Sequence, residues 1–529
     1  MILYRGGTVL TMERETPRAQ ALLEDGGVIR AVGDERALRA LAPKAAVAEL
    51  KGGALLPAFI DAHSHFSAAA SALLQVPLEE CADFGEIRER IEAFIRSSDI
   101  PPGEWVVAKG YDHNALAEGR HPDAAFLDAI TAAHPLLLQH KSGHAGAANT
   151  AALERLGVGS GTPDPPDGRY GRDETGAPNG YLEEGAFMRA IRSVPAADGA
   201  ALLDAYRRAQ DKYASFGITT VQEGMMVAQM RPLYEALLSS GLLKLDLVGY
   251  ADRADADALY AQFPNAAGQY DGHFKLGGIK MFLDGSPQAR TAWMRPQSGY
   301  ITGDDQTGYG TMADDALLEG LRYAARRRVQ PLVHCFGDGA AQQLLDAVEL
   351  VEAEFTDFAA LRPVMIHAQF LAPDQLPQVK RLGVLPSFFA AHVYHWGDTH
   401  ARNLGAARAA LLSPAADALR EGIRFTFHQD TPVIEPDMLE TVWCAVNRQT
   451  KSGRTLGAQE AIGVEDALRA VTVNAAYQYF EEDEKGSLRA GKRADLVVLD
   501  RDPTAVDPAA LRDIRVMRTI KDGRTVFER

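Results

Sequence analysis

Short apolar runs alternate with amphipathic stretches through most of the chain, in the rhythm of a strand followed by a helix. Eight apolar runs have the length of buried strands: 54–61, 217–222, 244–250, 275–283, 329–335, 363–367, 383–390 and 423–427. Helical repeats follow most of them, as at 313–328, 339–355 and 464–479. This order predicts an α/β fold of the (β/α)8 TIM barrel type rather than an open doubly wound sheet. No Gly-x-Gly-x-x-Gly fingerprint follows the first run, which disfavours a dinucleotide fold.

Both ends of the chain have the pattern of short strands separated by glycine turns. The C-terminal end contains a buried-strand run at 495–500 and two further runs on either side of Asp522-Gly523, a hairpin signal. Neither end alone offers enough strands for a stable sheet. We therefore expect residues 1–57 and 481–529 to form one small composite β-sandwich domain beside the barrel. Two unrelated edge hairpins are the alternative.

The interval 66–216 breaks the strand–helix rhythm directly after the first barrel strand. It is much longer than a crossover connection requires, and it has helical stretches at 84–97 and 122–131 and a Gly/Pro/Asp-rich stretch at 157–179. We interpret 66–216 as a large insertion, a subdomain within a barrel that spans 58–480. A lid above the barrel mouth is one role for this subdomain, and the Gly/Pro/Asp-rich stretch is equally compatible with a disordered surface excursion.

Composition narrows the class of protein. The chain has 529 residues with 46% hydrophobic and 24% charged residues, as in ordinary globular proteins. The net charge of −16 is spread without a basic stripe, which disfavours nucleic acid, and no apolar run is long enough to cross a membrane. The three cysteines are far apart and the start lacks a signal-peptide pattern, which favours a cytoplasmic protein. Oligomeric state stays open, with a homodimer as one alternative because exposed barrel helices often pair.

The strongest chemical signal is Asp61-Ala62-His63-Ser64-His65, at the end of the first barrel strand. Residues i and i+2 of a strand face the same side, so His63 and His65 can bind one metal together. Alone, His-x-His is a weak motif. Potential ligands at other strand ends strengthen the case for a metal site: His334 is at the end of the fifth strand, His367 is at the end of the sixth, and Asp430 follows the eighth. Barrel active sites lie at the C-terminal strand ends, so we predict one metal site.

Lys280 lies within an otherwise apolar strand, where an unpaired ammonium is costly. One interpretation is an ion pair with Asp284 or Glu223. The other is a carbamate, formed with carbon dioxide, that bridges two metal ions.

The ensemble of these residues resembles the amidohydrolase superfamily, and in particular the amidohydrolase family 3 branch, which includes N-substituted formamide deformylases. The resemblance runs nearly end to end. Besides the candidate ligands, the segments that carry it are Thr219-Thr220-Val221-Gln222-Glu223, Asp284-Gly285-Ser286, Gly337-Asp338, Gly486-Ser487-Leu488 and Gly491-Lys492-x-Ala494-Asp495-Leu496.

The resemblance implies a metal-dependent hydrolase with one or two divalent ions, commonly zinc. It assigns the more buried ion to His63, His65 and Asp430, the second ion to His334 and His367, and the bridge to Lys280. Two departures concern the substrate rather than the ligands. Many relatives have an acid where Ile366 precedes His367, and many have Ser-Asp where this chain has His428-Gln429-Asp430.

The expected reaction is hydrolysis of the C–N bond of a small-molecule amide, of the N-acyl or N-formyl amine type, by metal-activated hydroxide. Asp430 acts as the general base and then as the acid for the leaving amine. One alternative is a heterocycle aminohydrolase (deaminase) with one metal, and a second is a non-catalytic barrel scaffold.

Three residues are weaker candidates for substrate contacts. His144 lies in the insertion, Trp293 follows the fourth strand and His392 follows the seventh. The alternative for His144 is a loop histidine in solvent, and the alternative for Trp293 is core packing. His392 is a candidate to polarise a carbonyl.

Overall fold

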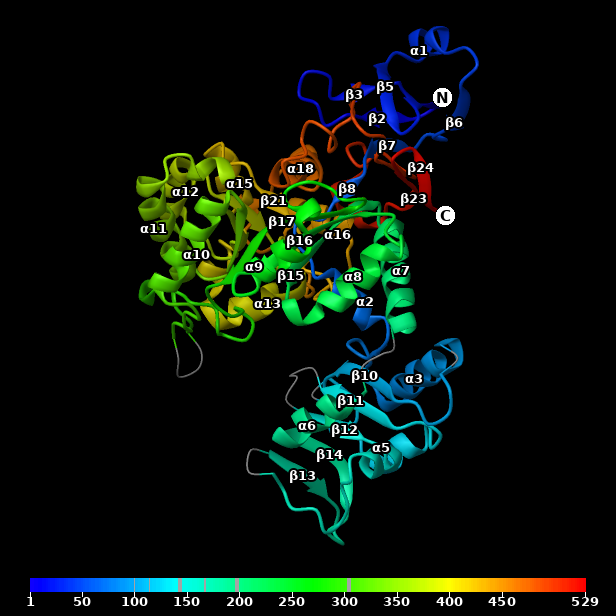
Figure 1. Cartoon of the computed structure of the whole chain (residues 1–529), viewed down its shortest axis with the longest axis vertical. Helices are drawn as coiled ribbons and strands as arrows, with labels where there is room; N and C mark the ends of the chain where they lie inside the picture. Colours follow the sequence, from blue (N-terminus) through cyan, green and yellow to red (C-terminus); the bar gives the residue numbers. More distant parts are fainter. Residues whose placement is uncertain (99, 114, 141–144, 166–167, 196–198, 302–305) are drawn as a thin grey trace. The chain divides into compact units, whose positions relative to one another are not determined.

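The computed structural model describes residues 1–98, 100–113, 115–140, 145–165, 168–195, 199–301 and 306–529 (Figure 1). The chain divides into two compact units, a first unit of residues 1–67 and 209–529 and a second unit of residues 68–208. Among the described residues, none of the helices combines the length and apolar character that crossing a bilayer requires.

The first unit is built around an eight-stranded parallel sheet whose strands follow one another in chain order. The strands are β8 (Phe59–Ile60), β15 (Ile218–Met226), β16 (Asp246–Asp252), β17 (Phe274–Phe282), β18 (Gln330–Cys335), β19 (Val364–His367), β20 (Leu385–Phe388) and β21 (Thr426–Phe427). The sheet curls, and two backbone hydrogen bonds join the segments after its two edge strands: Asp430 N–H donates to His63 O (3.2 Å) and His65 N–H to Thr431 O (2.8 Å).

Helices connect the parallel strands and surround them in Figure 1. Those of the first unit between β15 and the end of the sheet are α8 (Arg231–Ser239), α9 (Ala256–Gln262), α10 (Asp314–Arg327), α11 (Asp338–Glu354), α12 (Leu376–Leu382), α13 (His392–Leu404), α14 (Ala406–Ala409) and α15 (Ala415–Arg420). Three more follow β21: α16 (Met438–Asn447), α17 (Val464–Ala470) and α18 (Val473–Gln478). Because each connection returns the chain to the start of the next strand, all C-terminal strand ends lie at one side of the sheet.

Two predicted elements, the strand 54–61 and the helix 464–479, are each divided into two in the structure. The run 54–61 is not one strand: β7 (Ala54–Pro57) pairs with a C-terminal strand, and the chain then passes into β8 of the parallel sheet. Both pieces are buried, so the apolar pattern shows no boundary. The predicted helix 464–479 is interrupted at Thr472, whose backbone leaves the helical region and whose hydroxyl donates to Leu468 O instead.

Strands from both ends of the chain share one sheet. Its order is β24 (Arg524–Glu528), β23 (Val516–Lys521), β22 (Leu496–Leu499), β7, β2 (Thr8–Leu10) and β3 (Arg18–Ala19). A second sheet is entirely N-terminal, in the order β5 (Val28–Gly33), β4 (Ala21–Asp25), β1 (Ile2–Arg5) and β6 (Ala46–Glu49), with α1 (Glu35–Leu41) beside it. The antiparallel pairing of β22 with β7 is the link between the ends, and both strands are buried at its centre.

A buried charged cluster joins the C-terminal segment to the start of β16. The Asp246 carboxylate accepts hydrogen bonds from Lys485 Nζ at 2.7 Å and Arg493 Nη1 at 3.3 Å, and Lys521 Nζ lies 3.1 Å away. Burial alone would raise the pKa of Asp246, but the adjoining cations hold it well below its usual value. Ion pairs of this kind attach the strands of the chain ends to the parallel sheet.

The second unit has a six-stranded mixed sheet of its own. Its order is β13 (Gly168–Arg172), β14 (Pro178–Glu184), β12 (Ala145–Ala148), β11 (Leu136–His140), β10 (Val106–Tyr111) and β9 (Val76–Pro77). Its helices are α3 (Phe84–Ser98), α4 (Ala124–Asp128), α5 (Thr150–Arg155) and α6 (Gly185–Ser193), while α2 (Phe66–Ala72) and α7 (Gly199–Ser215) connect the two units in the sequence. The stretch 157–179 therefore includes β13 and the start of β14 rather than a loop alone.

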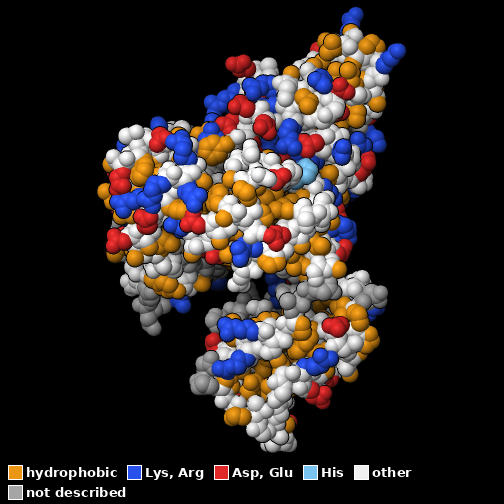
Figure 2. All heavy atoms as spheres, viewed as in Figure 1, with side chains coloured by type: hydrophobic (Ala, Val, Ile, Leu, Met, Phe, Trp, Pro, Cys, Tyr) orange, Lys and Arg blue, Asp and Glu red, His pale blue; other side chains and the backbone are white. Residues whose placement is uncertain are grey.

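Charged side chains of both signs are interspersed on the face of the molecule shown in Figure 2. Acidic and basic groups alternate over the helices of the first unit, where many of them form ion pairs, such as Arg322 with Glu354 and Arg381 with Glu349. The face drawn there has no continuous basic surface, in line with the distribution of charge along the sequence.

Candidate metal centre

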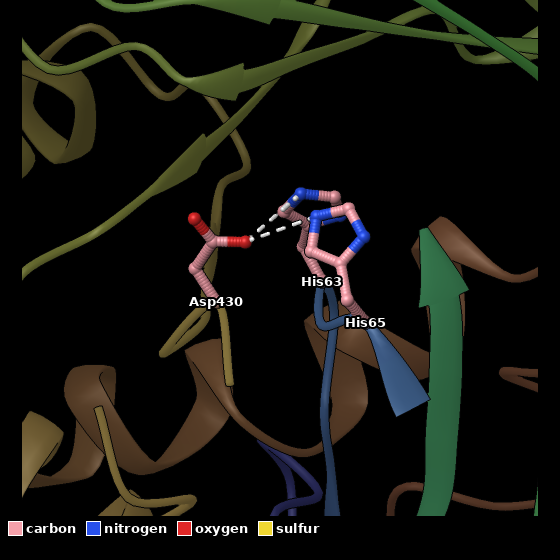
Figure 3. A group of neighbouring side chains, drawn as sticks. All are labelled: His63, His65 and Asp430. Atoms are coloured by element: carbon pink, nitrogen blue, oxygen red, sulfur yellow. Dashed lines mark ion pairs between the residues drawn. The ribbon is translucent and has the colours of Figure 1, made fainter. Parts of the chain in front are cut away.

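His63, His65 and Asp430 meet at the C-terminal ends of the first and last parallel strands. In Figure 3 both imidazoles turn toward one carboxylate oxygen, with His63 Nε2 and His65 Nε2 each 3.4 Å from Asp430 Oδ1. One potential ligand atom from each residue lies within 4.8 Å of the other two. The backbone bonds between the two segments hold these side chains in place.

The spacing fits a shared cation. Ligand atoms at 2.0–2.2 Å from a tetrahedral zinc ion are about 3.4 Å apart, the separation of both histidines from Asp430 Oδ1. Asp430 Oδ1 is shielded from solvent and accepts no well-formed hydrogen bond from the described residues. A buried carboxylate oxygen without a hydrogen bond is costly, and a bound cation would satisfy it.

The surroundings of His63 prepare it as a ligand. Its Nδ1 lies 2.6 Å from Gln222 Oε1, while Gln222 Nε2 donates to Ala62 O and to Tyr479 Oη, so the amide oxygen is left to accept from Nδ1–H. The lone pair of His63 therefore lies on Nε2, toward Asp430. Burial, followed by the charge of Lys280, lowers the pKa of His63 well below its usual value and keeps the ring neutral, the form that binds a metal.

His334 and His367 form a second pair, with His334 Nδ1 and His367 Nε2 3.2 Å apart. His334 Nε2 faces the carbonyl of Gly285 at 3.3 Å, so it carries the proton, and burial lowers the pKa of His334 to about 3. His367 Nδ1 faces His428 Nε2 at 3.1 Å, and His428 Nδ1 faces the Ser387 hydroxyl at 2.9 Å. When Nδ1 of His367 donates to His428, the lone pairs of His334 Nδ1 and His367 Nε2 face each other. A cation bound between these two atoms would remove their repulsion.

His367 reaches this position through an unusual backbone conformation. The strand register aligns His334 with Ile366, and Ile366 packs in the core with Leu332 and Val364. His367 would then point to the opposite face, but its φ is +72°, in the left-handed region. This turn at the strand end brings its ring to the side of His334. Asp430 also has positive φ (+56°), and such strained residues are concentrated at functional sites.

Lys280 lies beside this group, with Nζ 3.1 Å from His63 Nε2. Among the described residues, no ion pair joins Lys280 to Asp284 or Glu223. Asp284 accepts backbone hydrogen bonds from Phe336, Gly337 and Trp293, and Glu223 accepts from Ser67 N–H. Burial lowers the pKa of Lys280 to about 7, despite the opposing charge of Asp430.

All six predicted ligands thus lie in one contiguous group, in which the His63 and His367 ring centroids are 5.6 Å apart. Sequence analysis did not assign His428 or Gln222 to the site. His428 is two residues before Asp430 and contacts His367, and Gln222 orients His63. Residues two apart on a strand face the same side, so counting two residues back from Asp430 would have indicated His428 as a site residue.

The three weaker candidates lie elsewhere or outside the described residues. His144 is not among the described residues. Trp293 lines a cavity of about 350 Å³ between α10 and α11, together with Leu318 and Leu350, and none of the six predicted ligands lines it. His392 is buried beside Phe389 and Phe336, and the latter ring stacks on His367 at 3.9 Å. Of the two described candidates, His392 is the one close to the predicted ligands, with the ring of Phe336 between it and His367.

The chain is similar to known proteins over nearly its whole length. The sequence profile of the amidohydrolase family matches residues 46–527. The N-substituted formamide deformylase of Arthrobacter pascens is 30% identical, over 100% of this chain and 98% of that protein. Protein LONG AFTER FAR-RED 3 of Arabidopsis thaliana is 27% identical, over 94% of this chain and 87% of that protein. A metal-dependent hydrolase of Pyrococcus horikoshii has the same fold, with a TM-score of 0.77 at 24% identity, covering 96% of this chain and 99% of that one.

Proposed function

The chain belongs to the amidohydrolase family, and it is a hydrolase acting on C–N bonds; on this premise we propose that it cleaves N-formyl or N-acyl amines with a divalent metal bound at His63, His65 and Asp430. The observation that carries the proposal is the convergence of two imidazoles on an otherwise unsatisfied carboxylate oxygen. The similarity to the formamide deformylase over the full length supports the substrate class.

The same donor set supports zinc as the metal. Imidazole nitrogen with a carboxylate oxygen is typical of catalytic zinc, which keeps a position open for water or substrate. When bound, such an ion lowers the pKa of water to about 7 and polarises a carbonyl. His334 and His367 would hold a second ion, with Gly285 O and His428 fixing the orientation of their rings.

In this proposal Asp430 moves the proton. Burial would raise its pKa, but His65, His428 and Lys280 hold the pKa of Asp430 below its usual value, so it is a carboxylate at neutral pH. As general base it accepts the proton of the attacking water, and it then returns this proton to the nitrogen of the leaving amine. The phenyl ring of Phe336 stacks on His367 and presents an apolar surface beside this ligand.

Lys280 supplies the bridge in the two-metal form of the proposal. Its neutral amine adds carbon dioxide, forming an N–C bond and releasing one proton, and the product is a carbamate anion. The lowered pKa of Lys280 makes the neutral amine available. The carbamate also removes the difficulty of a buried ammonium 3.1 Å from His63 Nε2.

The sheet topology supports the finer description of the fold. We propose that the eight strands close as a (β/α)8 barrel through the contacts between the segments after β8 and β21. The pairing of β22 with β7 likewise supports one composite β-domain from both ends, with 66–216 as an inserted subdomain.

The test combines a substrate screen with metal analysis. The purified, zinc-loaded chain is assayed for formate and amine release from N-formyl amines, alongside N-acyl amines, dipeptides and cyclic amides. His65→Asn should lose the metal bound at this centre and the activity together. His134→Asn, at a histidine of the second unit that faces the backbone carbonyl of Glu104, is the matched control and should keep both.

Two outcomes would overturn the proposal. Ammonia release from a heterocycle, with a single bound ion and no amide hydrolysis, would favour a deaminase. Purified protein without divalent metal after zinc loading would favour a non-catalytic scaffold.

A further inference from the structure

A second group of histidines lies in the second unit, at the ends of two adjacent parallel strands. β10 and β11 pair in parallel, with Tyr111 opposite His140, so Asp112 and His113 leave β10 where β11 ends at His140. This placement follows the same rule as the candidate metal centre, in which ligands come from the C-terminal ends of neighbouring strands. The group is entirely within the second unit.

The geometry of this group fits one ion. One potential ligand atom each from Asp112, His113 and His140 lies within 4.8 Å of the others. His113 Nδ1 and His140 Nε2 are 3.1 Å apart, and His140 Nε2 is 3.8 Å from Asp112 Oδ1. These separations bracket the roughly 3.4 Å expected between ligands of a tetrahedral zinc ion. All three side chains are partly buried, so solvent can deliver an ion to them.

His121 adds a third imidazole to the group. Its ring stacks on that of His113 with centroids 4.0 Å apart, and its centroid is 5.4 Å from that of His140. Its Nδ1 lies 3.0 Å from the Tyr111 hydroxyl. The group therefore offers three imidazole rings close to one another, and imidazole nitrogen is a ligand type that zinc prefers.

We propose that Asp112, His113 and His140 bind a divalent transition-metal ion of the zinc class, separate from the candidate metal centre of the first unit. Two imidazole nitrogens with one carboxylate favour zinc over magnesium or calcium, which prefer all-oxygen sites. His121 or water completes the coordination. The bound ion cross-links the segment after β10 to the end of β11, and so stabilises the second unit.

The first experiment counts the ions. Parent, His113→Asn and His140→Asn chains are loaded with Zn²⁺, freed of unbound metal and analysed by mass spectrometry of the metal. Each variant should hold about one zinc ion per chain less than the parent, while the control His134→Asn holds as much as the parent. Removing the first centre with His65→Asn should leave the zinc ion of this group in place, so the two sites are distinguished.

A second measurement uses the unaltered chain and does not depend on whether a variant folds. Diethyl pyrocarbonate modifies accessible imidazoles, and peptide mass spectrometry reports the extent at each histidine. Zinc loading should reduce modification of His113 and His140 at least several-fold relative to chain treated with a chelator. Equal modification in both samples, or zinc content unchanged in both variants, would overturn the proposal.

Discussion

Asp246 is the anchor of the C-terminal segment, and Asp246→Asn tests how that segment is held. The side chains of Asp246 and Lys485 are each only 1% exposed, with Lys485 Nζ 2.7 Å from the carboxylate. Lys521 and Arg493 contact the same oxygen. The asparagine side chain keeps the volume but removes the charge, and leaves these cations with fewer counter-charges.

The magnitude follows from burial. Removing one partner of a buried ion pair costs about 3–5 kcal/mol of the free energy of unfolding. Glu481 still contacts Lys485 and Asp495 still contacts Lys521 in the variant, so we expect the lower end, about 3 kcal/mol. The unfolding entropy is roughly 2.1 cal/mol/K per residue, which for a unit of roughly 390 residues gives a decrease of about 4 °C in Tm.

Thermal unfolding followed by calorimetry and circular dichroism measures this change. The matched control is Asp257→Asn, which removes an exposed pair with Arg327 and should change the unfolding free energy by no more than about 0.5 kcal/mol. An Asp246→Asn variant that unfolds within 1 °C of the parent would refute the reasoning, because the cations would then be stabilised without that carboxylate.

Three further predictions concern the same first unit. The difference in unfolding free energy between parent and Asp246→Asn should have its full size at pH values above about 3.9, the pKa of an Asp in the unfolded chain. It should decline as the pH falls through the lower pKa of Asp246 in the folded chain, and denaturant titrations from pH 3 to 7 measure it. Lys280→Ala should lose about half of the metal bound at the candidate metal centre of the first unit, measured by elemental analysis, with short carboxylic acids partly restoring turnover; unchanged metal content would count against the bridge. Deleting 481–529 should expose β7 and cause aggregation, detected by light scattering, whereas a soluble and active truncation would show that the two ends are independent.

The strand–helix order and the candidate ligands could be predicted because both depend on short-range patterns. His63 and His65 are two residues apart, and parallel strand ends gather at one side, so no distances were required to expect a common site. The orientation of His367 could not be predicted, because alternation places Ile366 beside His334 and only a left-handed residue reverses that order. The division of the run 54–61 between two sheets could not be predicted either, because the residues in both sheets are apolar and buried.

The histidine group of the second unit could not be predicted from the sequence for a related reason. Its residues come together only because β10 and β11 pair. This pairing depends on Gly110, where the register between β10 and β11 shifts by one residue. Gly110 has φ of +97°, a conformation that side chains rarely adopt, and an added Cβ would lie 2.5 Å from atoms of Glu79.

Gly110→Ala should therefore displace the segment that carries Asp112 and His113 from His140. We expect the variant to lose about one zinc ion per chain and the zinc protection of His113, while the metal at His63 and His65 is retained. Gly159→Ala is the matched control in the same unit, because an added Cβ there meets open space. Full zinc occupancy in a folded Gly110→Ala chain would contradict the argument, since the bulge would then not be what aligns the two strand ends.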